Sequence, residues 1–288
     1  MPLSYVSLLL ALFALLPSVS VHAEDAPPRR ANSLAGQQMS MSAARPNSAW
    51  QLQTTDNFCI CCSTAVDSAS IGRACESLRE QLSRQWLGDD ARQQPWISRC
   101  YVVVHPTMAS YLCEVGLAGS RTLGSSITRT EHGQVVSRRI DLRGDITDPL
   151  KATLPHELTH VILADAFAGE ELPRWADEGV AMLADPAEKL AGHARDLQTA
   201  ISDQKLFHVA ELFATGEYPA ADGRTVFYAE SSSVVRYLVS RKSSADFLRF
   251  VHLALRSGYN DALHQVYAID NMGQLERLWR SDSARMTR

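Results

Sequence analysis

Residues 154–163 read Leu-Pro-His-Glu-Leu-Thr-His-Val-Ile-Leu, and this stretch decides how the rest of the chain is interpreted. Its His-Glu-x-x-His pattern places His156 and His160 slightly more than one helical turn apart, so both imidazoles project from one face of a helix. The apolar residues that follow predict a helix near 155–167 that belongs in a core. Polar side chains that point into a core need partners, and a metal ion provides them. The alternative is a surface helix with two solvated histidines, and the apolar flank argues against it.

A candidate for the third metal ligand lies on the next predicted helix. Residues 172–181 read Leu-Pro-Arg-Trp-Ala-Asp-Glu-Gly-Val-Ala, and Pro173 fits the first turn of a helix. Glu178 lies on this helix, and the small Gly179 after it lets a second helix approach closely. Two neutral imidazoles and one carboxylate make a zinc site with a position open for water, which distinguishes catalytic from structural zinc. The alternative for Glu178 is an exposed helix carboxylate.

The two motifs resemble those of the gluzincin class of zinc metallopeptidases. They are most similar to small MA-like peptidase domains with an HExLTH motif and a PRWxxEGxA helix. The resemblance implies an α+β, zincin-like fold and a peptidase that acts on peptide or protein substrates. It implies that His156, His160 and Glu178 bind Zn2+. It also implies that Glu157 is the general base that acts on a zinc-activated water.

The resemblance extends to a third motif further along the chain. Residues 227–231, Phe-Tyr-Ala-Glu-Ser, match a Tyr-Ala-x-Ser helix of that family. The match implies that Tyr228 stabilises an oxyanion, and a core tyrosine is the alternative. Many gluzincins also carry an Asp four residues after the glutamate ligand to orient a histidine, but this position is Met182 here. Asp165 and Asp177 are therefore the candidates for that role.

The cysteines are confined to the first half of the chain. They are Cys59, Cys61, Cys62, Cys75, Cys100 and Cys113. An even number in an oxidising compartment predicts three disulfides. Bonds within the closely spaced cluster of Cys59, Cys61 and Cys62 would be strained, so each is expected to pair with one of the other three. Several pairings stay open. A cysteine-rich metal site is the alternative.

The N-terminus has the pattern of an exported protein. Residues 6–16 form an apolar run broken by one serine, and residues 21–23, Val-His-Ala, offer a small-residue cleavage site. Residues 1–23 are therefore expected to be a signal peptide, which predicts a secreted or periplasmic protein. Residues 24–48 are rich in Pro, Ser, Ala, Arg and Gln and predict a flexible leader. We find no later apolar run long enough to predict a membrane anchor.

The remaining chain divides by pattern into two halves. Residues 49–147 predict a small disulfide-stapled unit of sheet and helix, and residues 148–288 predict a largely helical half. Together they would form one zincin-like catalytic unit. The predicted strands are 50–60, 100–104, 125–130 and 134–142, the last two forming a hairpin. The predicted helices are 71–86, 155–167, 173–184, 186–202, 225–241, 244–256 and 273–280.

Composition narrows the range of partners. The net charge is −4, with 21% charged and 45% hydrophobic residues, which is ordinary for a globular protein and does not indicate a nucleic-acid partner. Nothing in the sequence indicates an oligomeric state. The functional alternative to a peptidase is a secreted, non-catalytic binding protein that keeps a zincin fold and its metal site. The presence of Glu157 favours catalysis, because a purely structural site needs no base.

Overall fold

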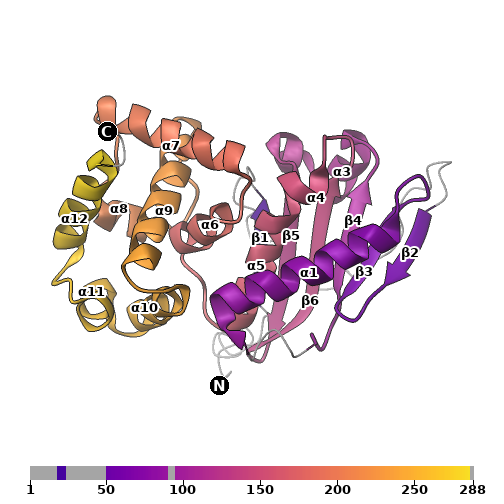
Figure 1. Ribbon diagram of the computed structural model, residues 1–288, viewed down its shortest axis with the longest axis horizontal. Helices are drawn as coiled ribbons and strands as arrows, with labels where there is room; N and C mark the ends of the chain where they lie inside the picture. The colour runs from indigo at the N-terminus through magenta and orange to yellow at the C-terminus, as the bar shows by residue number, and fades with distance from the viewer. Residues whose placement is uncertain (1–17, 24–49, 90–94, 286–288) are drawn as a thin grey trace, which may run out of the picture.

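The computed structural model describes residues 18–23, 50–89 and 95–285. The first half of the chain builds a single sheet with its covering helices, and the second half is helical, so the expected α+β class is confirmed (Figure 1). Most of the predicted signal peptide and the whole predicted leader, residues 24–48, lie outside the described residues. Residues 18–23 of the predicted signal peptide form an edge strand.

The sheet has six strands in the order β1-β5-β6-β4-β3-β2. Strands β3, β4 and β6 are parallel, and the other neighbours are antiparallel. The bounds are β1 Ser18–Ala23, β2 Trp50–Thr54, β3 Phe58–Ser63, β4 Cys100–His105, β5 Gly124–Glu131 and β6 Gln134–Arg143. The predicted hairpin is confirmed as β5 and β6, which are joined through His132 and Gly133, both at positive φ.

The prediction of one strand over 50–60 is wrong, because the chain reverses between β2 and β3. The Thr55 amide N–H donates to the Phe58 carbonyl at 2.9 Å and closes the turn. The Glu76 carboxylate then accepts hydrogen bonds from the Thr55 hydroxyl and the Asn57 amide, at 2.6 and 2.7 Å. The turn that Glu76 stabilises therefore divides the expected strand into the antiparallel strands β2 and β3.

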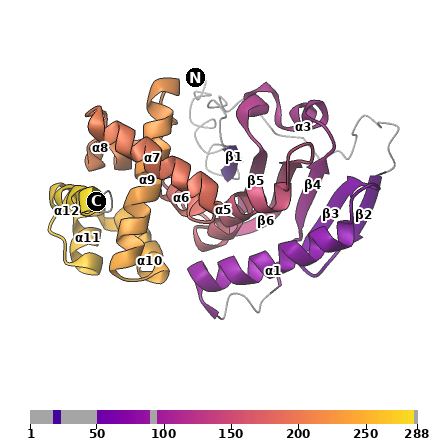
Figure 2. The same cartoon turned by 45° about the horizontal axis from the view of Figure 1, so that its top comes forward.

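Helices cover both faces of the sheet. Helices α1 (Ser68–Leu87) and α5 (Leu154–Ala166) lie on one face, where alternate strand residues such as Val102 and Ile140 are fully buried (Figure 2). Helix α3 (Met108–Val115) lies on the other face and is followed by a short 3-10 helix, η2 (Leu117–Arg121). The sheet therefore presents one of its faces to the helix that carries both motif histidines.

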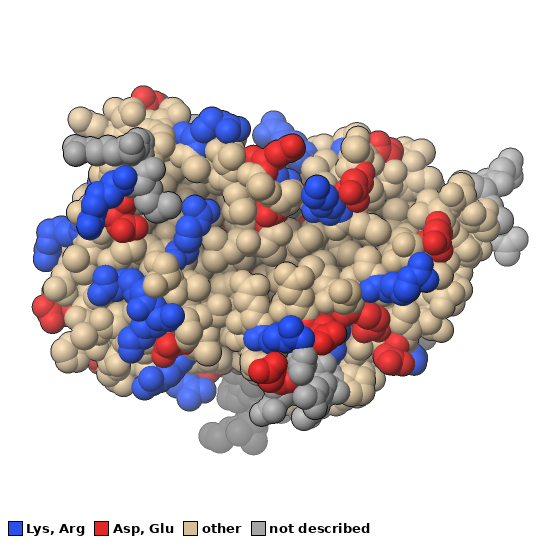
Figure 3. Space-filling model, viewed as in Figure 1, with Lys and Arg blue, Asp and Glu red and all other residues tan. Residues whose placement is uncertain are grey.

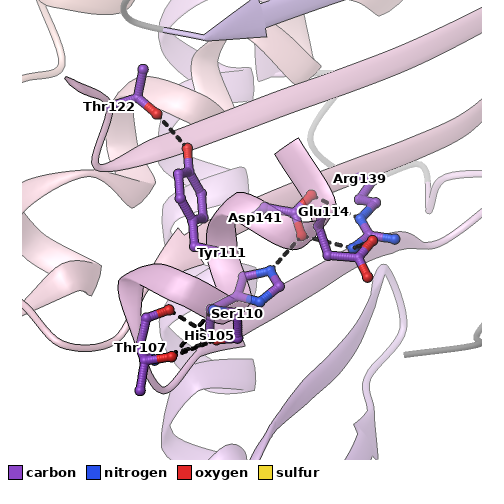
Figure 4. A network of polar contacts seen from close by, with 8 residues as sticks. All are labelled: His105, Thr107, Ser110, Tyr111, Glu114, Thr122, Arg139 and Asp141. Atoms are coloured by element: carbon purple, nitrogen blue, oxygen red, sulfur yellow. Dashed lines mark hydrogen bonds and ion pairs between the residues drawn. The ribbon is translucent and has the colours of Figure 1, made fainter. Parts of the chain in front are cut away.

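A buried polar network holds α3 on its face of the sheet (Figure 4). The His105 ring in β4 pairs with Asp141 in β6 at 2.8 Å. Arg139 binds the same aspartate and reaches Glu114 of α3 at 3.1 Å. Because its charged groups compensate one another, the His105–Asp141 pair can be buried between the helix and the sheet, and the more exposed Arg139 and Glu114 link the pair to α3.

The second half of the chain is a cluster of helices beside the sheet, with α5 lying between the two (Figures 1 and 2). Pro155 lies in the first turn of α5, and the short helix α4 precedes it. Proline lacks the amide hydrogen that a helix interior needs, but the first turn tolerates it, so the two helices are separate. The other bounds are α4 Pro149–Ala152, α6 Arg174–Met182, α7 Ala187–Ser202, α8 Val209–Ala214, α9 Ala221–Arg241, α10 Ser244–Ser257, α11 Tyr259–Tyr267 and α12 Met272–Arg285. The sequence patterns missed the short helices α3, α8 and α11.

Helix α6 is held tightly in this cluster. Trp175 is fully buried, and its ring stacks on Phe213 at a centroid distance of 3.9 Å. A Cβ atom at Gly179 would lie 2.6 Å from the Ser231 carbonyl oxygen of α9. Helices α6 and α9 therefore approach so closely that only glycine fits, and α6 has a fixed position relative to its neighbours.

The predicted disulfide framework is not found, because all six cysteines are free thiols. Cys75 and Cys100 belong to the core that β3 and β4 share with α1, whereas alternation along β3 turns Cys59 and Cys61 to the opposite face. Cys113 on α3 is the one predicted partner on that side of the sheet. Two thiols thus face a single partner, which does not match the expected pairing of each clustered cysteine with one of the other three.

Two further observations concern membrane-spanning helices and surface charge. Within the described residues, no helix is long and apolar enough to cross a membrane. On the face seen in Figure 3, lysine and arginine side chains are interspersed with acidic ones.

Candidate metal centre

Helix α5 brings two histidines together at its buried face. The His156 and His160 rings lie one turn apart with their centroids 4.9 Å from each other, and their Nε2 atoms are separated by 3.2 Å. Each side chain is about 2% exposed. Because the helix is packed against the sheet and α6, both rings are enclosed and their Nε2 atoms converge.

Helix α6 adds a carboxylate to the same point. Oε2 of Glu178 lies 3.7 Å from Nε2 of His156 and 4.0 Å from Nε2 of His160. One ligand atom from each of the three residues falls within 4.8 Å of the others. The structure thus brings together the three side chains that the sequence analysis assigned to the metal.

The donor set fits a zinc ion. Within the described part of the chain, Oε2 of Glu178 is buried and makes no hydrogen bond, although burial of a carboxylate oxygen is costly without a compensating cation or donor. Two imidazoles and one carboxylate are the ligand set of catalytic zinc sites that keep a position for water or substrate. A cation among these three side chains would compensate the buried charge.

Each histidine also has a carboxylate behind its ring. Nδ1 of His160 lies 2.7 Å from Oδ1 of Asp177, which immediately precedes Glu178 in α6. Nδ1 of His156 lies 3.5 Å from Oδ1 of Asp185. Burial would raise the pKa of Asp185, but His156, His193 and Lys189 outweigh it and hold that pKa below its usual range. Both rings therefore turn Nδ1 toward an anion and Nε2 toward the cluster.

Of the two aspartates proposed to orient a histidine, only Asp177 lies at the cluster. Asp165 lies near the end of α5 and accepts a hydrogen bond from the Trp96 indole at 2.6 Å. It also pairs with the buried Arg138 of β6. Asp165 therefore ties α5 to the sheet, and the expectation that it orients a histidine is corrected.

Glu157 is held by the sheet. Its carboxylate is about 1% exposed, and its Oε2 accepts a hydrogen bond from the Ser126 hydroxyl of β5 at 2.8 Å. A Cβ atom at Gly124 would lie 2.9 Å from both Cγ and Oε1 of Glu157 and 2.4 Å from Cγ2 of Thr153. The start of β5 thus holds Glu157 through the Ser126 hydrogen bond, and the missing side chain at Gly124 leaves room for the Glu157 side chain.

A tyrosine that the sequence analysis did not select contacts the cluster. The Tyr218 hydroxyl, from the segment between α8 and α9, donates a short hydrogen bond to Oε1 of Glu178. Burial and the neighbouring Glu178 carboxylate hold the pKa of Tyr218 well above its ordinary value, so the phenol stays protonated. Arg174 of α6 fixes this segment, because its guanidinium lies 4.6 Å from the Tyr218 ring centroid and its Nε donates to the Gly216 carbonyl at 2.8 Å.

Tyr228, the predicted oxyanion stabiliser, lies beside Tyr218. Its half-buried ring packs against the helical core, with the centroid 6.1 Å from that of Tyr218. The two tyrosines are thus neighbours, and the hydroxyl of Tyr218 contacts Glu178.

Comparison with known proteins assigns part of the chain. A family model described as the peptidase MA superfamily matches residues 138–284, about half of the chain. The matched region runs from β6 to α12 and contains the three proposed ligands and Glu157. Ser126 and Gly124 of β5 precede it. A comparison with curated proteins gives no match.

Proposed function

The chain belongs to the peptidase MA superfamily, and on that premise we propose that it is a zinc-dependent peptidase that hydrolyses peptide bonds in peptide or protein substrates. The observation that carries the proposal is the convergence of His156, His160 and Glu178 at one buried point. Glu157 lies in the same helix beside the first histidine, where a general base for this reaction is needed. Zn2+ is the proposed cofactor.

In the proposed mechanism Glu157 transfers one proton, and neighbouring side chains position the reacting groups. A zinc ion held by the three ligands would supply a Lewis acid that polarises the scissile carbonyl and makes water a stronger nucleophile at neutral pH. Glu157 takes a proton from the attacking water and passes it to the leaving amine nitrogen. Ser126 keeps Oε2 of Glu157 in place through its 2.8 Å hydrogen bond. We propose that Oε1 carries the proton.

A tyrosine hydroxyl is proposed to stabilise the oxyanion that develops on the substrate carbonyl. Tyr228 has this role by family position, and Tyr218 has a protonated hydroxyl at the ligand cluster. The ring centroids of Tyr218 and Tyr228 lie 6.1 Å apart, so the two rings are neighbours. We assign the donor role to Tyr218, because its hydroxyl lies at a proposed ligand and would turn its single proton from Oε1 of Glu178 to the oxyanion as that charge develops.

We also propose that the protein is exported. The apolar run over residues 6–16 and the small residues around Ala23 support a signal peptide. Cleavage after Ala23 would remove the edge strand β1, whose one partner among the described strands is β5. The five remaining strands would keep their pairing, and β5 would become the edge of the sheet next to Glu157.

One observation favours a second candidate, a binding protein with a structural metal. The ligands and Glu157 are each at most about 2% exposed, so these side chains have little contact with solvent. A structural metal requires no access, whereas a peptidase must admit its substrate. The Ser126 hydrogen bond to Glu157 supports the catalytic candidate, because it orients a residue that metal binding alone does not need.

The experiment compares metal content with hydrolysis. Purified protein is expected to hold about one zinc ion per chain, as a single His2Glu site implies. Exhaustive chelation should abolish hydrolysis of an unfolded protein substrate, and added zinc should restore it. His156→Ala and His160→Ala should lose both zinc and activity, whereas His264→Ala, at an exposed histidine of α11, should keep both. Wild-type zinc content in both metal-site variants would contradict the proposed site.

A further inference from the structure

Asp185 is a deeply buried carboxylate that the proposed reaction does not use. Its side chain has no exposed surface, and neither oxygen makes a hydrogen bond of normal length to a described residue. Three nitrogen atoms surround it instead: Nδ1 of His156 at 3.5 Å, Nζ of Lys189 at 3.6 Å and Nε2 of His193 at 3.6 Å. Burial of a carboxylate is tolerated when such groups compensate it. The innermost of them is His156.

The end of α6 explains how Asp185 reaches this place. The helix ends at Met182, and the next residues form tight turns in which the Asp185 amide donates to the Met182 carbonyl at 3.1 Å. Pro186 then begins the approach to α7. The turn carries the Asp185 side chain back to the His156 ring. Met182 itself, where many gluzincins have the orienting Asp, is apolar and only about 2% exposed.

We propose that Asp185 is the positioning residue of His156 and takes the place of the acidic side chain that is absent at position 182. Asp185 accepts the Nδ1 proton of the ring, which fixes the tautomer and turns the Nε2 lone pair toward His160 and Glu178. Asp177 has the equivalent relation to His160, at 2.7 Å. The inference rests on the proposed zinc site, because a positioned ligand requires a metal.

Lys189 and His193 have a different task. Both lie on α7, and their side chains are about a quarter exposed, so they can exchange Asp185 for water. They compensate the charge of Asp185 with side chains that are more exposed than that of His156. A purely structural role for Asp185, as a tie between α6 and α7, would involve these two residues as much as His156. The two roles differ in what zinc affinity depends on.

The test measures the dissociation constant for zinc by competition with a chromophoric chelator. Asp185→Asn keeps the size of the side chain but removes its charge, and it is expected to weaken zinc binding by about 10–100-fold. Lys189→Met is the matched control: it breaks the outer contact, leaves Asp185 against His156, and should bind zinc like the wild type. A folded Asp185→Asn variant with wild-type zinc affinity would overturn the inference, and so would equal weakening in both variants.

A second measurement uses the wild type and does not depend on how a variant folds. In the zinc-loaded protein, 15N NMR of the histidine side chains should show His156 protonated at Nδ1 and bound to metal through Nε2. Metal on Nδ1, or a proton on Nε2, would overturn the inference. A wild type that binds no zinc would reject the proposed function as well, whereas zinc binding with an unaffected Asp185→Asn variant would reject the inference alone.

Discussion

Gly124→Ala tests whether the sheet positions the general base. The added methyl carbon would lie 2.9 Å from Cγ and Oε1 of Glu157 and 2.4 Å from Cγ2 of Thr153. Carbon atoms pack at about 3.5–4.0 Å, so the methyl group must push the Glu157 side chain or the start of α5 aside by about 1 Å. Glu157 is about 1% exposed, so the displaced side chain must move among packed neighbours.

The expected magnitude follows from that displacement. Overpacking of a filled site costs about 1–3 kcal/mol, which corresponds to a fall in Tm of roughly 2–4 °C per kcal/mol for a chain of this size. A displacement of about 1 Å in a reacting group costs about 10²-fold in rate. Zinc content should stay close to that of the wild type, because the methyl group meets Glu157 and Thr153 and none of the three ligands.

The assay measures kcat/KM, zinc content and thermal unfolding on the same preparations. Gly192→Ala is the control, because a Cβ there meets only the end of a flexible arginine at 3.9 Å in helix α7. That change should leave activity unaltered and raise stability by about 0.5–1 kcal/mol through helix propensity. A Gly124→Ala variant with full zinc and wild-type kcat/KM would refute the argument that β5 fixes Glu157.

Three further predictions concern other parts of the structure. Gly179→Ala should lower Tm by more than Gly124→Ala, because its Cβ would lie 2.6 Å from a backbone oxygen that cannot rotate away; equal Tm values in differential scanning would contradict the close approach of α6 and α9. Tyr218→Phe should retain zinc and lose about 10²–10³-fold in kcat, as removal of an oxyanion donor does, whereas Tyr228→Phe should have the smaller effect in the same assay. Burial raises the pKa of Glu230 to about 8, above its ordinary value of 4.5. Between these two pH values the unfolded chain loses the Glu230 proton while the folded state retains it, so the free energy of unfolding falls as pH rises from about 4.5 to 8. Glu230→Gln should flatten that decline in thermal unfolding measured across this pH range, and an unchanged decline would show that Glu230 does not cause it.

The sequence predicted those parts of the site that local periodicity controls. The two histidines lie one turn apart in α5, and proline chemistry sets where that helix begins, so both could be placed from residues 154–163 alone. Glu178 could be placed on the next helix for the same reason. Asp177 was found because it is adjacent to Glu178 in the chain and its helix was correctly predicted.

The rest of the site depends on contacts that are distant in sequence. Asp185 lies beyond the end of α6, and its direction is set by a turn that carries no periodic pattern. Tyr218 belongs to a connecting segment and meets Glu178 only because Arg174 fixes that segment. Ser126 and Gly124 come from a strand whose register places them against α5. The cysteine pairing failed for a related reason, since strand alternation separates Cys59 and Cys61 from the thiols on the other face of the sheet.

The most direct test of the proposed function is a paired measurement of zinc stoichiometry and hydrolytic rate on the wild type and Glu157→Gln. The glutamine keeps the shape of the side chain and a hydrogen-bonding oxygen for Ser126 but cannot accept the proton. The account predicts a folded variant with about one zinc ion per chain and a rate lower by about 10²–10⁴-fold, beside Glu188→Gln, an exposed control with wild-type values. Near-normal hydrolysis by Glu157→Gln at full zinc content would contradict the mechanism. A wild type with full zinc and no hydrolysis of any peptide or protein tested would favour the binding protein instead.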